Sequence, residues 1–272
     1  MLFKRVICQS GGITTAGRAQ DKNKLLQYSR EFAQTIGCYN SSLDNNSSER
    51  FAGCLQSINA SLLTVIDAQF QEQGHGLFNP IYGDDLLPVE PKLAEFPGDK
   101  DVIIGQVANE GTNFVYLSFR DTFSKLLPPR KVNKLEMIYF IRNMYGALTL
   151  PQTLQLQQAY MKDIAEYDYG ALRQALIDIR GHSEVTCGSL DVASQACKFY
   201  RTERGRQRCV LLRNELRVLA CSKEHPWVGM THGDDFPFVF GRPFDKKGCA
   251  KGQALQLRNS SRCGATLRKE GM

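Results

Sequence analysis

The chain lacks the long apolar run that a membrane helix requires. None of its 272 residues belongs to an uninterrupted apolar stretch of about 18 residues, so we expect no membrane span. The opening residues MLFKRVICQSGG have too short an apolar stretch, and no small-residue cleavage site, to be typical of a signal peptide. Tryptophan occurs once and histidine four times, within an otherwise ordinary globular composition of 42% hydrophobic and 23% charged residues.

A basic fold is also absent, although the net charge is +6. The positive charge belongs to two segments, 198–224 and 245–272, each of which carries five more basic than acidic side chains. Neither segment has a nucleic-acid-binding motif, so we expect no nucleic-acid partner. Residues 245–272 contain no aromatic side chain, and we interpret them as a basic, disordered tail.

Nine cysteines are too few for a disulfide scaffold of this length and many for a cytosolic protein. Cys187, Cys197, Cys209 and Cys221 are spaced too widely for the close pairs typical of zinc sites, so we expect no metal site among them. Asn-x-Ser/Thr sequons indicate a glycosylated, secreted protein, the alternative being a loop that is simply rich in Asn and Ser. The candidate glycosylation sites are Asn40, Asn45, Asn46, Asn59 and Asn259.

The hydrophobic patterns predict an α/β fold with a mostly parallel sheet and flanking helices. RVICQSGG near the start and DVIIG at 101–105 are typical of buried parallel strands. Helical spacing of apolar residues predicts helices at 22–37, ending at Gly37, at 51–70 and at 160–179.

Two side chains are candidates for acid–base chemistry. Glu110 follows the strand DVIIG, and His232 lies in WVGMTHGDDFPFVFG. In an open parallel sheet, functional side chains gather beyond the carboxyl ends of the strands. The order Glu before His is that of an α/β-hydrolase triad. The alternatives are a Glu that caps a helix and a His satisfied within an aromatic pocket.

Four segments carry a resemblance to a known family: LFKRVICQSGG, FNPIYGDDLLP, IIGQVANEGTNFV and WVGMTHGDDFPFVFGRPF. They resemble the strand ending in Q-S-G, the proline-bounded turn, the acidic triad motif and the histidine motif of the type-B carboxylesterase and cholinesterase family of α/β-hydrolases. The resemblance implies a partial α/β-hydrolase domain at 1–244, incomplete at both ends, that acts on small-molecule carboxylic esters without a cofactor or metal. It also implies that His232 is the general base, that Glu110 orients it, and that Cys38 and Cys54 form a short disulfide loop.

The chain departs from the family in its nucleophile. No G-x-S-x-G elbow occurs in 1–272, CGSLD at 187–191 lacks the flanking glycines, and Ser10 belongs to the Q-S-G element rather than to the elbow. Segment 198–224 also lacks the family's strand rich in Tyr and Phe. We therefore expect residues 1–272 alone to fold poorly and to be inactive, in a protein that the resemblance places outside the cell. The alternative is a non-catalytic adhesion or binding member of the family, and the oligomeric state stays open.

Overall fold

The computed structural model describes residues 3–12, 19–39, 48–72, 75, 77–95, 100–202, 209–214 and 225–240. The chain divides into two compact units, one made of Met1–Thr15 and Phe96–Met272 and the other of Ala16–Glu95. The predicted basic tail at 245–272 lies outside the described residues, as do four of the candidate glycosylation sites, Asn40, Asn45, Asn46 and Asn259.

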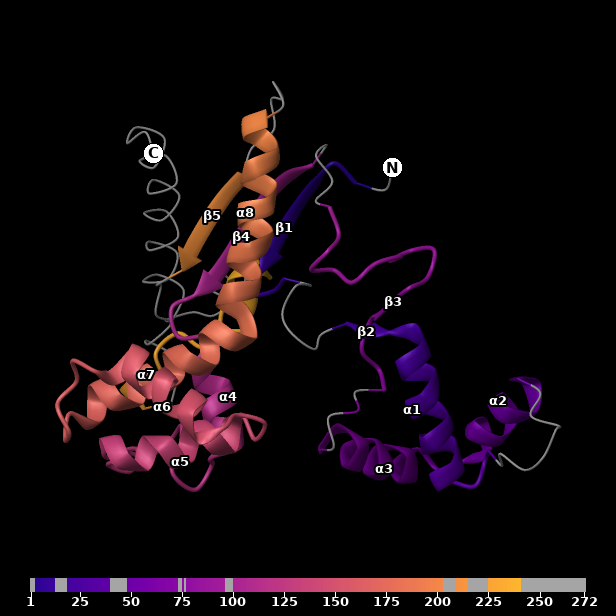
Figure 1. Ribbon diagram of the computed structural model, residues 1–272, viewed down its shortest axis with the longest axis horizontal. Helices are drawn as coiled ribbons and strands as arrows, with labels where there is room; N and C mark the ends of the chain where they lie inside the picture. Colours follow the sequence, from indigo (N-terminus) through magenta and orange to yellow (C-terminus); the bar gives the residue numbers. More distant parts are fainter. Residues whose placement is uncertain are drawn as a thin grey trace. The chain divides into compact units, whose positions relative to one another are not determined.

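The first unit is built on a parallel sheet, as the sequence predicts. Its strands β1 (Arg5–Gln9), β4 (Asp101–Val107) and β5 (Cys209–Asn214) are ordered β1-β4-β5, and both pairings are parallel. All three arrowheads point toward a cluster of helices (Figure 1). The chemistry of the unit is therefore expected at that end of the sheet.

Two features of the sheet differ from the sequence-based expectation. Strand β1 is not buried on both faces: Val6 and Cys8 pack against the cluster of Val102, Ile104 and Ala193, while Ile7, on the opposite face, is 66% exposed. Within the described part of the chain β1 pairs only with β4 and so lies at an edge. Strand β5, with the sequence CVLLRN, lies in the segment that departs from the family's aromatic-rich pattern. Its run of apolar residues supports a strand without any Tyr or Phe.

Among the described residues one helix packs on the sheet, and further helices form the main core of this unit. Helix α8 (Cys187–Thr202) packs on β4 and β5, continuing from a π-helical turn at His182–Thr186 (Figure 1). The other helices are α4 (Gly111–Ser118), α5 (Lys134–Met144), α6 (Leu150–Met161) and α7 (Tyr169–Gly181). Their fully buried side chains include Met137, Ile141, Met161, Leu172 and Leu176, and Phe123 from the loop between α4 and α5 joins the same core. A 3₁₀ turn at Pro226–Val228 and the short helix α9 (Phe236–Val239) complete the described part.

The single helix predicted for 160–179 is wrong, because the chain forms two helices there. Helix α6 ends at Met161, and α7 begins only at Tyr169. The Asp168 side chain accepts the Ala171 backbone N–H and so caps the start of α7. The apolar spacing continues across the break, but the capping residue decides where the second helix starts.

The second unit contains the helices α1 (Lys22–Thr35), α2 (Ser48–Ser57) and α3 (Ala60–Glu72) and the two-stranded parallel pair β2 (Gln20–Asp21) and β3 (Ile81–Tyr82). Gly37 follows α1 with a φ of 80°, as expected for a glycine that ends a helix. The predicted helix at 51–70 is split, since Asn59 is exposed and its side chain accepts the Ser61 N–H at the start of α3.

A disulfide joins Cys38 to Cys54 in the second unit, with their Cα atoms 5.6 Å apart. No single helix in the described residues is long and apolar enough to cross a membrane. Helices α2 and α3, which meet at a bend of 106°, pass that test of length and composition only when taken together.

Candidate active site

Glu110 lies where β4 gives way to α4, and it is only 3% exposed. It does not cap the helix, since its side chain makes no capping hydrogen bond. Instead Oε1 accepts the Val107 backbone N–H at 2.8 Å and the hydroxyl of Ser10, which follows β1. The ends of the two neighbouring strands thus hold this carboxylate in place.

The other oxygen of Glu110 is bonded to His232. His232 Nδ1 lies 2.7 Å from Glu110 Oε2, although 122 residues separate them in the sequence. An ionised carboxylate can only accept, so Nδ1 carries the proton and Nε2 is left as the basic nitrogen. The His232 side chain is 39% exposed while its partner is buried, which is the arrangement of a base held from behind by an acid.

The loop that carries His232 is bound to the segment that carries Glu110. Asn109 and Thr231 form an isolated parallel bridge, in which the Asn109 N–H donates to the Met230 carbonyl at 2.9 Å. In the first turn of α4, the Asn113 side chain donates to the His232 carbonyl at 2.6 Å, and its backbone N–H donates to Thr231 Oγ1. These bonds fix the separation of Glu110 and His232 through the backbone itself.

Close packing at two glycines positions the same segments. A Cβ on Gly111 would lie 1.9 Å from the Ile177 carbonyl oxygen, so α4 can approach α7 only because this residue has no side chain. Gly229 has a φ of 65°, and a Cβ there would lie 2.2 Å from Asn109 Oδ1. Both glycines belong to the motifs that surround Glu110 and His232.

Several neighbouring residues have structural roles. Trp227 packs against the helical core and donates its indole N–H to the Ser124 carbonyl at 3.0 Å, as expected for core packing. His225 is half-buried, and its Nδ1 accepts the Trp227 backbone N–H at the start of the 3₁₀ turn. Asp234 closes the turn after His232 by accepting the Thr231 N–H. Asp235 is buried.

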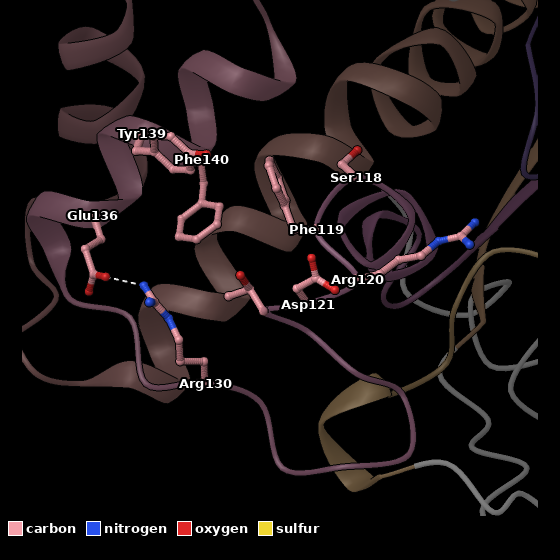
Figure 2. Close-up of a pocket in the computed structure, with 9 residues that line it drawn as sticks. Ser118, Phe119, Arg120, Asp121, Arg130, Glu136, Tyr139 and Phe140 are labelled. Carbon is pink, nitrogen blue, oxygen red and sulfur yellow. Dashed lines mark hydrogen bonds and ion pairs between the residues drawn. The ribbon is translucent and has the colours of Figure 1, made fainter. Parts of the chain in front are cut away.

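A polar pocket of about 490 Å³ lies elsewhere in this unit, between the end of α4 and the start of α5. The Arg130–Glu136 ion pair bounds it on one side, and Arg120 points away from that pair (Figure 2). Ser10, Glu110 and His232 are not among its lining residues, so the pocket is separate from the acid–base pair. The lining consists of Ser118, Phe119, Arg120, Asp121, Thr122, Arg130, Glu136, Tyr139 and Phe140.

Comparison with known proteins places the chain in a family. The profile of the carboxylesterase family matches residues 1–259. The chain belongs to the carboxylesterase family. Its sheet and helices are accordingly part of an α/β-hydrolase fold, and the resemblance to the type-B carboxylesterases and cholinesterases is confirmed.

The curated relatives include acetylcholinesterases and a neuroligin. Acetylcholinesterase-1 of Trittame loki is 22% identical over 259 residues, covering 89% of this carboxylesterase-family chain and 43% of the relative. Acetylcholinesterase of Leptinotarsa decemlineata is 25% identical over 260 residues, covering 90% of the chain and 38% of the relative. Neuroligin-2 of Rattus norvegicus is 24% identical over 247 residues, covering 89% of the chain and 27% of the relative. The chain therefore spans less than half the length of each of these relatives.

Sequence reasoning missed the anchoring of the acid by Ser10. The residue has a φ of 53°, which brings the chain out of β1 in the left-handed region, and its hydroxyl donates to Glu110. The Q-S-G motif was the available signal, since a Ser between a strand end and glycines suits a tight turn at the sheet edge where Glu110 also lies. The roles of Asn109 and Asn113 were also missed, although both flank Glu110 in the motif NEGTN.

Proposed function

We propose that this chain supplies the acid and base of a serine ester hydrolase. In this proposal His232 Nε2 takes the proton from the nucleophilic serine as it attacks the ester carbonyl, and returns the proton to the leaving alcohol. Glu110 holds the imidazole in the required tautomer and stabilises the imidazolium. The 2.7 Å hydrogen bond between the buried Glu110 and the half-exposed His232 carries the proposal.

The nucleophile in this proposal is a serine outside residues 1–272, which contain no G-x-S-x-G elbow. Ser10 is not assigned that role, because its hydroxyl donates to Glu110 Oε1 and so approaches the acid rather than Nε2 of the base. We assign Ser10 to positioning the carboxylate. The reaction forms an acyl-enzyme and then hydrolyses it, and it requires no metal or cofactor.

A second candidate function is protein binding without catalysis. The similarity to neuroligin-2, at 24% identity, favours it, because this relative matches as much of the chain as acetylcholinesterase-1 does. Against it stands the intact Glu110–His232 hydrogen bond, since a binding surface does not need a buried acid behind a histidine. For either function we propose a secreted or extracellular protein, which the Cys38–Cys54 disulfide and the exposed sequon at Asn59 support.

The test uses the complete gene product, meaning the polypeptide translated from the full transcript, beside residues 1–272 alone. Hydrolysis of a chromogenic acetate ester gives kcat/KM, and a fluorophosphonate probe labels a reactive serine. We expect turnover and labelling of the complete gene product only. Replacing Glu110 with Gln preserves its shape but removes the charge, and we expect kcat/KM to fall about 10³- to 10⁴-fold.

Glu166→Gln is the matched control, because Glu166 is exposed on the loop between α6 and α7. Its kcat/KM should stay within about twofold of the wild-type value, as expected for a surface substitution. If Glu110→Gln retained kcat/KM within a few-fold, the acid would be wrongly assigned. If the complete gene product neither turned over the ester nor reacted with the probe, the binding function would be favoured instead.

A further inference from the structure

Arg180 is an unusual cation to find beside an acid–base pair. It lies in the last turn of α7, and its side chain is only 20% exposed. Its Nε is buried and has no hydrogen-bond partner among the described residues. A guanidinium group carries a positive charge, and partial burial makes a charge act more strongly on its neighbours than it does at a surface.

The guanidinium of Arg180 lies over two aromatic rings. Its Cζ is 5.9 Å from the ring centroid of Phe114 and 5.3 Å from that of Tyr145, both within the range of cation–π attraction. Glu184, one turn further on, accepts from Nη1 at 3.0 Å. The carboxylate offsets part of the positive charge and fixes the position of the head group.

Phe114 connects this cation to the candidate base. Its ring centroid lies 5.4 Å from that of the His232 imidazole, tilted by 40°. Its helix, α4, is held against α7 by the close contact of Gly111 with Ile177, so the positions of Phe114 and Arg180 relative to each other are set by the backbone. A substrate group that approaches the His232 side of this ring therefore comes near a fixed positive charge.

Aromatic faces are common binding sites for quaternary ammonium groups. Here the protein's own guanidinium already binds Phe114, so a second cation at this ring would lose attraction and be repelled. We propose that Arg180 is a specificity-determining residue that makes the site discriminate against esters with a cationic group and favour uncharged ones. This inference rests on the proposed ester hydrolysis and names its substrate class.

The test compares two thioesters of the same shape in the complete gene product. Acetylthiocholine carries a quaternary nitrogen, and 3,3-dimethylbutyl thioacetate has carbon in its place; released thiol gives kcat/KM for both. We expect the wild type to prefer the uncharged ester by about tenfold, the size of a partly screened like-charge contact. Arg180→Gln should abolish this preference. Arg180→Lys keeps the charge, so its ratio of kcat/KM for the uncharged ester to that for the cationic ester should stay within about threefold of the wild-type ratio.

Two further variants separate charge from structure. Arg173→Gln is the matched control, since Arg173 lies on α7 and makes its cation–π contact with Trp227 rather than Phe114, so it should leave the ratio unchanged. Glu184→Gln removes the opposing carboxylate and should increase the preference for the uncharged ester. A wild type that prefers the cationic ester, or a ratio that Arg180→Gln leaves unchanged, would overturn the inference while leaving ester hydrolysis intact.

If the wild type hydrolyses neither thioester, the proposed function fails for these substrates. Binding of the tetramethylammonium ion, followed by NMR, then tests the site directly. Arg180→Gln should bind the ion about tenfold more tightly than the wild type and the Arg173→Gln control. Equal affinities would overturn the inference, and Arg180 would then have only a structural role.

Discussion

Replacing Gly111 with Ala adds one methyl group immediately after Glu110. The new Cβ would lie 1.9 Å from the Ile177 carbonyl oxygen and 2.6 Å from the Gly181 backbone nitrogen. Neither neighbour is a flexible side chain, because both atoms belong to the backbone of α7. The substitution therefore cannot be accommodated by a change of rotamer, and it requires the two helices to separate.

The size of the effect follows from that separation. To lengthen the 1.9 Å contact to an ordinary 3.4 Å, α4 and α7 must move apart by 1.5 Å. A gap of this size loses much of the van der Waals attraction between the helices, and such overpacking costs about 3 kcal/mol. In a domain of this size that lowers Tm by about 6–12 °C. Because Glu110 precedes the altered residue, displacement of about 1 Å at the acid should also reduce kcat/KM about 100-fold.

Urea unfolding and ester hydrolysis of the complete gene product measure the two effects. Gly146→Ala is the control in the same unit, since Gly146 lies between α5 and α6 and a Cβ there meets nothing within 4 Å. It should be neutral, or stabilise by up to about 1 kcal/mol. If Gly111→Ala unfolded within about 0.5 kcal/mol of the wild type, the close approach of α4 and α7 would be refuted, and with it the account of how Glu110 is positioned.

Two further predictions concern the cysteines. Replacing Cys38 and Cys54 with Ala should destabilise the Ala16–Glu95 unit by about 3 kcal/mol, because the disulfide closes a loop over a separation of 16 residues. Limited proteolysis should then cleave this unit faster and leave the cleavage rate of the other unit unchanged. Burial raises the pKa of the half-buried Cys8 thiol, which lowers its thiolate fraction at pH 8, whereas the Cys187 side chain is exposed to the reagent. Iodoacetamide should therefore modify Cys187 at least about tenfold faster than Cys8, as followed by peptide mass spectrometry, and equal rates would contradict the partly buried setting of Cys8.

The parallel strands and the acid–base candidates were predictable because both depend on local signals. DVIIG is an apolar run ended by polar residues, and β4 occupies it as the central strand of the described sheet. Glu110 and His232 each follow from a short motif, and the family resemblance supplies the expectation that they meet. The Asp21 cap and Gly37 bound α1 within two residues of the predicted 22–37.

Other features depend on contacts that no local pattern shows. Ile7 of β1 is exposed because it lies on the face opposite Val6 and Cys8, and the composition of RVICQ does not reveal which of its two faces packs against other residues. The break between α6 and α7 depends on whether Asp168 caps a helix or lies on its surface, and an apolar period continues unchanged through either arrangement. Arg180 gave no signal, because its partners Phe114 and Tyr145 come from other helices.

The candidate acid–base pair is held in place by contacts among the described residues. Glu110 is held by the end of β1 through Ser10, by the end of β4 through Val107, and by His232, whose loop is bound to α4 through Asn113. A carboxylate with these donors has little freedom to rotate, so it fixes the proton on Nδ1 of the imidazole. Under the proposed function, a serine brought to Nε2 would therefore meet an imidazole already in the tautomer that accepts its proton, with Glu110 and His232 already in position.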